Sequence, residues 1–382
     1  MLSILLLTDW FPPGYKAGGP ITSCWNLSLL LSQKIKVYVL TSDRDLSDSD
    51  PYPDILPDIW IEVQKNLWVC YLSPSQQTIR GVNLQIQNIN PKVIYLNSLY
   101  SLVYTIYPMW LKWQGRLNNR MILAPRGMLK DSALAYKSLK KRWFIRILHW
   151  GLIASWVDFH ATDEKELLAI KNFFGRNAKI FLIPNNAVPI QAYRPKLITN
   201  SYHFLFVGRI HPIKGLKEAL LFLRKIKHPL TFSIVGSNEV SSYWQECQGI
   251  IETLPSHIKV DYLGELPPIR LKKILETHHF LLLPTKGENF GHAIFEALAK
   301  GLPVIISNQT PWKELQELGI GWDISLDSSE SFVAAIENAV NMPPCEYFAM
   351  SKAAWQYAKD FITNSRLQER YLEMFESPGE NY

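Results

Sequence analysis

Two short stretches of the chain combine cations, carboxylates and glycines in a way that suits an anionic, hydroxyl-rich ligand. The first, residues 208–215 (GRIHPIKG), lies between an expected strand and an expected helix. A helix N-terminus and two cationic side chains stabilise negative charge at one point, so Arg209 and Lys214 suit a diphosphate. Taken alone, Arg209 and Lys214 are more simply interpreted as ordinary surface residues.

The second stretch, residues 284–298 (PTKGENFGHAIFEAL), reads as a strand end, a glycine-bracketed turn and a helix that opens near Gly291 and stops at Gly301. We expect Glu288 in the turn and Glu296 one or two turns inside the helix. A carboxylate accepts two hydroxyls, so one acid suits sugar hydroxyls and the other a ribose. The alternative is that Glu288 caps the helix and Glu296 is solvated.

Length and composition indicate a globular protein of about two domains. The chain has 382 residues, of which 47% are apolar and 19% charged, so we expect two buried cores and little disorder. No run approaches the roughly 18 to 20 apolar residues of a membrane span, and residues 2–7 are too few for a signal peptide. The cysteines form no CxxC pair, which favours free thiols in the cytoplasm: Cys24, Cys70, Cys247 and Cys345.

The net charge of +6 is concentrated in the first half. Residues 1–185 hold 21 Lys and Arg against 13 Asp and Glu, and residues 100–150 hold ten cations against the single Asp131. Such a patch indicates an anionic partner such as a membrane surface, phosphates or nucleic acid. Residues 136–156 interleave cations with apolar side chains, and residues 108–113 add two tryptophans. As a helix, residues 136–156 either lie in a membrane interface or pack their apolar face on the first domain.

Strands alternate with helices along the whole chain, which predicts an α/β fold of doubly wound parallel sheets. Expected strands begin near residues 3, 36, 93 and 121, and again near residues 204, 230, 280 and 304. A stretch rich in Pro and Asn separates the two sets. We therefore predict two Rossmann-like domains facing a cleft, residues 1–185 and 199–360, joined by a linker at residues 186–198. The stretch from residue 350 to 375 is helical by pattern, and residues 361–382 are expected to cross back to the first domain.

These motifs resemble family 4 of the retaining glycosyltransferases, which has the two-domain GT-B fold. The resemblance covers nearly the whole chain and rests on the ExxxxxxxE spacing of Glu288 and Glu296 and on the upstream GRxxxxKG loop. Gly18 and Gly19 match the first glycine loop of that family, and residues 184–186 (PNN) resemble its PNG linker. The GENFGH turn together with the TPW triplet at residues 310–312 looks like a bacterial exopolysaccharide-biosynthesis branch.

The resemblance implies a role for each of these residues. Arg209 and Lys214 would bind the donor diphosphate and stabilise the leaving nucleotide, Glu288 would hold sugar hydroxyls, and Glu296 would hold the ribose. The first three are the implied catalytic residues. The other implied donor-binding residues are Gly18 and Gly19 of the first domain and Asn289, Phe290, Gly291 and His292 of the turn. The family also implies an acceptor-side first domain and a second domain that binds the nucleotide sugar.

One departure from the family pattern concerns the first domain. Many members place a sugar-facing His where this chain has residues 124–129 (APRGML). We count Arg126 among the donor-binding residues, but three roles stay open for it: binding a donor phosphate, binding an acidic group of the acceptor, or pairing with an Asp.

The expected chemistry needs neither a metal nor a cofactor. Departure of a nucleotide diphosphate develops negative charge on phosphate, so two cations at that point favour the transition state. Two DxD triplets, residues 43–45 and 48–50, fall in one Asp- and Pro-rich loop, and we interpret them as solvated turn residues. The family implies retention of configuration. No side chain stands out as a nucleophile, which is compatible with a front-face route in which the departing phosphate acts as base.

The predicted function is transfer of a hexose from a nucleotide-diphosphate sugar to a saccharide acceptor in exopolysaccharide biosynthesis. UDP-hexose is the preferred donor, UDP-glucose first, followed by GDP-mannose. If the basic stretch docks on anionic lipid, the acceptor is a lipid-linked saccharide and the protein is peripheral at the inner leaflet. Three other classes stay open. They are a nucleotide-sugar epimerase of the same fold, a non-catalytic sugar-binding protein, and a nucleic-acid binder, although no recognised nucleic-acid module is present.

Overall fold

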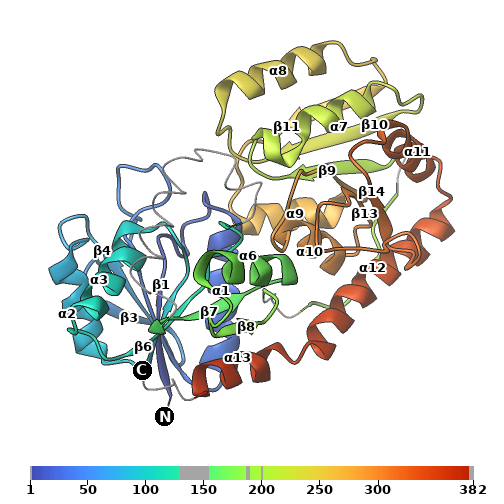
Figure 1. The fold of residues 1–382 in the computed structure, drawn as a ribbon. Helices are drawn as coiled ribbons and strands as arrows, with labels where there is room; N and C mark the ends of the chain where they lie inside the picture. Colours follow the sequence, from blue (N-terminus) through green and yellow to red (C-terminus); the bar gives the residue numbers. More distant parts are fainter. Residues whose placement is uncertain (1, 130–154, 186–189, 199–200, 378–382) are drawn as a thin grey trace. The chain divides into compact units, whose positions relative to one another are not determined.

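The chain forms two compact units. The computed structural model describes residues 2–129, 155–185, 190–198 and 201–377. One unit comprises Met1–Ala187 together with Arg366–Tyr382, and the other comprises Val188–Ser365 (Figure 1). Each unit is organised around its own β-sheet.

Within the described residues, the first unit contains an eight-stranded sheet in the order β3-β4-β2-β1-β5-β6-β7-β8. All neighbouring strands are parallel except β3, which is antiparallel to β4. The central strands are continuous apolar runs because helices cover both faces of the sheet. The strands are β1 (Ser3–Leu7), β2 (Lys36–Ser42), β3 (Trp60–Gln64), β4 (Leu67–Leu72), β5 (Val93–Leu96), β6 (Arg120–Leu123), β7 (Asp158–Ala161) and β8 (Ile180–Leu182).

Two apolar cores lie on opposite faces of this sheet. One core combines strand residues with buried side chains of α1 (Gly19–Ser32) and α13 (Leu367–Glu376). The other includes residues of α2 (Ile79–Ile89), α3 (Tyr107–Trp113) and α6 (Glu164–Phe174). A short π-helical segment, η1 (Leu102–Ile106), precedes α3. The first unit is therefore a three-layer α/β/α sandwich.

The last helix belongs to the first unit although it follows the second in sequence. The helical stretch expected from residue 350 to 375 is divided into α12 (Pro344–Asn364) and α13, because Arg366 adopts a left-handed φ of 44° that ends the helical path. Helix α13 packs beside α1 (Figure 1). Tyr371 is fully buried, and its hydroxyl donates to the Pro184 carbonyl at 3.1 Å.

The second unit contains a six-stranded parallel sheet in its described residues, in the order β11-β10-β9-β12-β13-β14. Helix α7 packs against α8 and α11, and α10 packs against α12. The strands are β9 (His203–Val207), β10 (Leu230–Val235), β11 (Ile258–Tyr262), β12 (Phe280–Leu283), β13 (Val304–Ser307) and β14 (Gly321–Ile324). The helices are α7 (Leu216–Leu223), α8 (Ser241–Glu252), α9 (Pro268–Thr277), α10 (His292–Ala299), α11 (Ser329–Val340) and α12.

Each sheet has a topological switch point at its first strand. Strand β1 lies between β2 and β5, and strand β9 lies between β10 and β12, so successive connections leave these strands in opposite directions. In open α/β sheets the loops at the carboxyl ends of such strands diverge and leave a ligand crevice. The topology therefore predicts ligand crevices at the loops after β1 and β5 and at the loops after β9 and β12.

The predicted α/β fold of two parallel-sheet units is confirmed, with some strands that we did not expect. Strands β3 and β11 carried weak signals because each lies at a sheet edge and most of its residues are exposed or partly exposed. The other strands that we did not expect are β4, β7, β8 and β14. No helix among the described residues is both long and apolar enough to cross a bilayer. The basic part of the stretch expected at residues 136–156 lies outside the described residues.

Candidate functional site

The cation loop, residues 208–215, connects β9 to α7. A short 3₁₀ turn, Pro212–Lys214, forms its second half, and the His211 ring nitrogen Nδ1 accepts a hydrogen bond from the Ile213 amide at 3.1 Å. Burial, together with the positive charges of Arg209 and Lys214, lowers the pKa of His211 below its usual value. The imidazole is therefore held neutral, which leaves Nδ1 free to accept this bond.

The acid loop, residues 284–291, connects β12 to α10 and lies in backbone contact with the cation loop. The Lys286 amide donates to the Ile213 carbonyl at 2.7 Å, and the Thr285 hydroxyl donates to the same oxygen at 3.0 Å. Gly215 has a φ of 77°, and a Cβ added there would lie 2.1 Å from the Pro284 carbonyl oxygen. Only glycine satisfies both the left-handed backbone and this approach.

The contact between the two loops brings two of the expected catalytic side chains together. Lys214 Nζ lies 2.5 Å from Glu288 Oε1, and the two side chains are 19% and 11% exposed. Arg209, on the same loop as Lys214, pairs instead with Glu239 at 2.7 Å. A cation and a carboxylate thus meet at the switch point of the second sheet. The cation suits an anionic group of a ligand, and the carboxylate suits its hydroxyls.

Glu296 lies in α10 and is partly exposed at its surface, although its carboxyl group is desolvated. That burial raises the pKa of Glu296 from 4.5 to about 7. No hydrogen bond to its side chain is formed within the described residues. A desolvated carboxyl group with unused acceptor positions suits a ligand that brings hydroxyl donors.

An aromatic cluster supports the turn of the acid loop. The Phe290 carbonyl accepts a hydrogen bond from Trp312 Nε1 at 2.6 Å, and the Phe290 ring contacts Trp312, Phe295 and Phe361. Gly291 takes a left-handed φ of 77° at the start of α10. The TPW triplet therefore has a structural role, since its tryptophan fixes the turn that precedes α10. Asn289 and His292 flank Phe290 and Gly291 in this turn.

The Asp-rich loop of the first unit anchors the glycine loop that precedes α1. The buried Asp45 carboxylate accepts hydrogen bonds from the amides of Tyr15 and Lys16 at 2.7 and 3.0 Å. At Gly18, with φ 64°, a Cβ would meet no heavy atom within 4 Å, so the backbone here borders open space, and Gly19 begins α1. We interpreted these aspartates as solvated turn residues, but Asp45 is buried and holds the loop.

Other aspartates of this loop form ion pairs. Asp48 pairs with Lys16, and Asp43 pairs with Arg44 at 2.9 Å. Among the residues that the structure describes, no three His, Cys, Asp or Glu side chains gather as a metal site.

Arg126 is held by neutral polar groups rather than by an Asp. Its Nε donates to Asn97 Oδ1 at 2.7 Å and its Nη2 to the Tyr95 hydroxyl at 2.9 Å, while Nη1 donates to Asn185. The Tyr95 hydroxyl lies 2.6 Å from His160 Nδ1, and burial lowers the pKa of His160 to about 3. The ring is therefore neutral. The network joins the ends of β5, β6 and β8, and the role of Arg126 in donor binding stays a prediction.

Sequence reasoning missed two polar residues near strand ends, Asp9 and Glu239, and misinterpreted a third, Asp45. Asp9 follows β1 and accepts a hydrogen bond from the Ser101 hydroxyl at 2.7 Å across the switch point, and burial raises its pKa. Asp45 and Glu239 follow β2 and β10. Asp9 and Glu239 belong to no motif, and their only signal in the sequence was their position shortly after apolar strands. Asp45 ends the first DxD triplet, which does not reveal that the residue is buried.

Comparison with known proteins gives the site its context. Residues 191–361 match the family described as glycosyl transferases group 1. An uncharacterized glycosyltransferase of Methanocaldococcus jannaschii is 31% identical over 106 residues, which are 27% of this chain and 26% of that protein. The alignment with this curated relative thus spans about a quarter of its length. Both similarities are thus to glycosyltransferases.

Solved structures resemble the chain over nearly its whole length. Sucrose-phosphate synthase from Thermosynechococcus elongatus has a TM-score of 0.73 at 17% identity, covering 99% of this chain and 100% of that one. HepE of Anabaena, in complex with UDP and glucose, has a TM-score of 0.72 at 16% identity with the same coverage. At these identities the similarity establishes the fold, which is the GT-B arrangement of two parallel-sheet α/β units.

The close approach of Gly215 to Pro284 predicts a large cost for Gly215→Ala. A left-handed non-glycine residue costs about 1–3 kcal/mol, and the clash with a backbone carbonyl adds to this. We expect a clear loss of unfolding free energy in denaturant titrations. Gly319→Ala is the matched control, because Gly319 has a φ of 64° with no heavy atom within 4 Å. Equal losses in the two variants would show that the loop contact contributes nothing.

The raised pKa of Glu296 predicts a pH-dependent difference between the wild type and Glu296→Gln. Between pH 4.5 and about 7 the folded state holds a proton on Glu296 that the unfolded state releases. The stability from this proton is therefore present below pH 4.5 and lost as pH rises through 7.

Since glutamine does not titrate, the variant should gain stability relative to wild type between pH 4.5 and 8, by about 3 kcal/mol at most. Thermal unfolding at several pH values measures this difference, with Glu317→Gln, an exposed residue, as control. A constant difference between Glu296→Gln and wild type would contradict the assignment.

Proposed function

We propose that the protein is a retaining hexosyltransferase that takes a nucleotide-diphosphate sugar as donor and a saccharide as acceptor. The observation that carries this proposal is the contact of Lys214 with Glu288 at the switch point of the second sheet. These residues are far apart in sequence, and the fold places the charge that suits a diphosphate beside the carboxylate that suits sugar hydroxyls. The match of residues 191–361 to group 1 glycosyl transferases supports the same function.

Each side chain has one role in this proposal. Arg209 and Lys214 bind the diphosphate and stabilise the charge that develops on it as the sugar leaves. Glu288 accepts hydrogen bonds from sugar hydroxyls, and Glu296 accepts them from the ribose. The amides of the turn that contains Phe290 contact sugar and phosphate. Gly18 and Gly19 let the first unit's backbone approach the donor, and Arg126 supports that side through its network.

The bond changes follow a front-face route. The bond between the anomeric carbon and the phosphate oxygen breaks, and its electron pair goes to the phosphate. The acceptor hydroxyl forms the new bond on the same face, and its proton passes to the departing phosphate oxygen. Configuration is retained without an enzyme nucleophile, and the cations supply the charge stabilisation for which a metal would otherwise be needed.

We propose UDP-hexose as donor, with UDP-glucose first and GDP-mannose second. Support comes from HepE, a similar structure that was determined in complex with UDP and glucose. Glu296 would bind the ribose of either nucleotide, so a thermal-shift screen of nucleotide sugars separates the candidates, because a ligand of the folded state raises stability by mass action.

Replacing Glu288 tests the donor site. Glu288→Gln should lower the turnover number by about 100-fold or more. UDP affinity should stay within about threefold of wild type, because the proposed partner of the carboxylate is the sugar and glutamine keeps one oxygen for Lys214 Nζ. Radiolabelled sugar transfer and calorimetry measure the two quantities, with Glu330→Gln, a replacement on α11, as control. Full activity is expected in EDTA.

Wild-type turnover in Glu288→Gln would contradict the assignment of the donor site. Conversion of the donor to an epimer without transfer would point to an epimerase. Loss of activity in EDTA that manganese restores would contradict the metal-independent route.

We further propose that the acceptor is a lipid-linked saccharide of exopolysaccharide biosynthesis, reached at the cytoplasmic leaflet. Trp110 and Trp113 of α3 are 46% and 62% exposed with their rings 4.9 Å apart, and Leu102 of η1 is 58% exposed. Exposed tryptophans favour the boundary between lipid and water. The basic stretch at residues 136–156 adds cations close by in sequence, which favour anionic lipid.

Co-sedimentation with liposomes tests this surface. Wild type should bind anionic vesicles at low salt and lose binding at high salt, because screening weakens the attraction between cations and lipid. A Lys140, Lys141, Arg142 triple alanine variant and a Trp110→Ala, Trp113→Ala variant should each bind less. Leu84→Ala, which removes an exposed apolar side chain of α2, is the control. Equal binding to neutral and anionic vesicles, or none, would indicate a soluble acceptor.

A further inference from the structure

Arg209 is held through one end of its guanidinium group. Its Nη1 donates to both carboxylate oxygens of Glu239, at 2.7 and 2.8 Å. The other two nitrogens, Nε and Nη2, form no hydrogen bond within the described residues. Nε and Nη2 together make the planar fork that matches two oxygens of a phosphate. The contact with Glu239 therefore leaves this fork unoccupied.

The backbone ties the loop that carries Glu239 to the cation loop. The Ile210 amide donates to the Ser237 carbonyl at 2.8 Å, and Ile210 forms a parallel bridge with Asn238. A Cβ on Gly236 would lie 1.9 Å from the Gly208 carbonyl oxygen, so the two loops pack backbone against backbone. These contacts fix the origin of the Glu239 side chain relative to that of Arg209.

The ion pair between Arg209 and Glu239 lies at the surface and contributes little to the stability of the fold. The Arg209 and Glu239 side chains are 43% and 37% exposed, and such pairs add little to folding free energy. An arginine on the surface otherwise samples many rotamers, and ordering it at the moment of reaction costs conformational entropy. A carboxylate that holds one nitrogen in advance lowers that cost. The expected benefit therefore concerns the geometry of Arg209 and not the stability of the fold.

We propose that Glu239 is a positioning residue that presents the Nε and Nη2 fork of Arg209 to the donor diphosphate. This inference rests on the proposed function, which makes Arg209 a diphosphate ligand. Glu239 itself contacts Arg209 and not the reacting atoms. Its effect on transfer therefore passes through Arg209 alone.

A double-mutant cycle tests this dependence. Glu239→Ala should lower the turnover number by about tenfold to 100-fold, since misplacing a reacting group by about 1 Å costs up to 100-fold. Its KM should change by less than threefold. Glu239→Gln, which keeps one acceptor oxygen for Nη1, should restore part of the rate. In the Arg209→Ala background, Glu239→Ala should have no further effect, because the group that it positions is gone.

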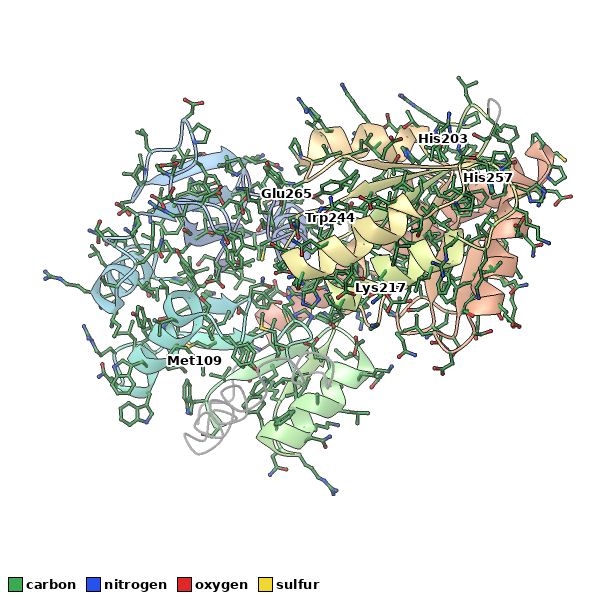
Figure 2. All side chains as sticks on the ribbon, turned by 90° about the horizontal axis from the view of Figure 1, so that it is seen from above. Met109, His203, Lys217, Trp244, His257 and Glu265 are labelled. Atoms are coloured by element: carbon green, nitrogen blue, oxygen red, sulfur yellow. The ribbon has the colours of Figure 1, made fainter. Side chains whose placement is uncertain are left out.

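The chain provides a matched control for the loss of one exposed carboxylate. Glu246 pairs with Lys217 at 2.7 Å, with side chains 55% and 42% exposed, in the same unit. Lys217 lies in the first turn of α7 and is labelled in Figure 2. Glu246→Ala should keep its turnover within twofold of wild type. Circular dichroism and UDP calorimetry on every variant verify folding and nucleotide binding.

The outcomes separate this inference from the proposed function. Wild-type activity in Glu239→Ala, or a further large loss in the Arg209→Ala background, would overturn the positioning role. Tighter UDP binding without a loss of turnover would also overturn it, because Glu239 would then compete with the phosphate for Arg209. Wild-type activity in Arg209→Ala would instead contradict the proposed function.

Discussion

The approach of Gly215 to the Pro284 carbonyl is the constraint on which the candidate site depends. Strands β9 and β12 are neighbours in the second sheet, and the loops after them diverge at the switch point. Contact between the loops requires a residue with no side chain, since a Cβ at position 215 would lie 2.1 Å from that oxygen. The same contact lets Lys214 reach Glu288. The backbone contact thus sets the distance across which these two charges pair.

Charge compensation is the second feature of this site. Arg209 pairs with Glu239, Lys214 with Glu288, and Lys286 with Glu218. Cations that are paired in this way are oriented and their mutual repulsion is reduced, so the region tolerates several positive charges before an anion binds. A ligand that carries negative charge then meets cations that are already oriented. The carboxylates therefore both organise the cations and set the charge that a ligand must match.

The first unit shows how polar groups after strands serve as anchors. The Asp45 carboxylate accepts hydrogen bonds from two amides of the glycine loop, and Asn97 Oδ1 accepts one from Arg126 Nε. In both cases an acceptor fixes a segment that lies beside the switch point of the first sheet. Helix α13 completes this unit from the far end of the sequence, and Tyr371 connects it to the chain at Pro184. A change near residue 371 therefore acts on the first unit, although the segment that precedes Arg366 in sequence belongs to the second.

The sequence by itself determined the α/β class, the two sets of alternating strands and helices, and the loops that bear Arg209, Lys214 and Glu288. Local spacing was sufficient there, because strand periodicity, glycines and helix starts are properties of neighbouring residues. The TPW triplet was also recognisable in the sequence. That its tryptophan, Trp312, fixes the turn before α10 was not. Strands β3 and β11, at the sheet edges, were missed because their exposed polar residues weaken the pattern.

Only the tertiary structure decided which side chains pair. Glu239 lies 30 residues from its partner Arg209, and Asp45 lies 30 residues from its partner Tyr15. Arg126 donates hydrogen bonds to Asn97 and Asn185, whereas pairing with an Asp was one of the expectations. The desolvation that raises the pKa of Glu296 is likewise set by the atoms packed around it. The physical reason is common to all four. Hydrogen bonding and desolvation depend on distances across the fold, and the order of strands in a sheet sets those distances independently of separation along the chain.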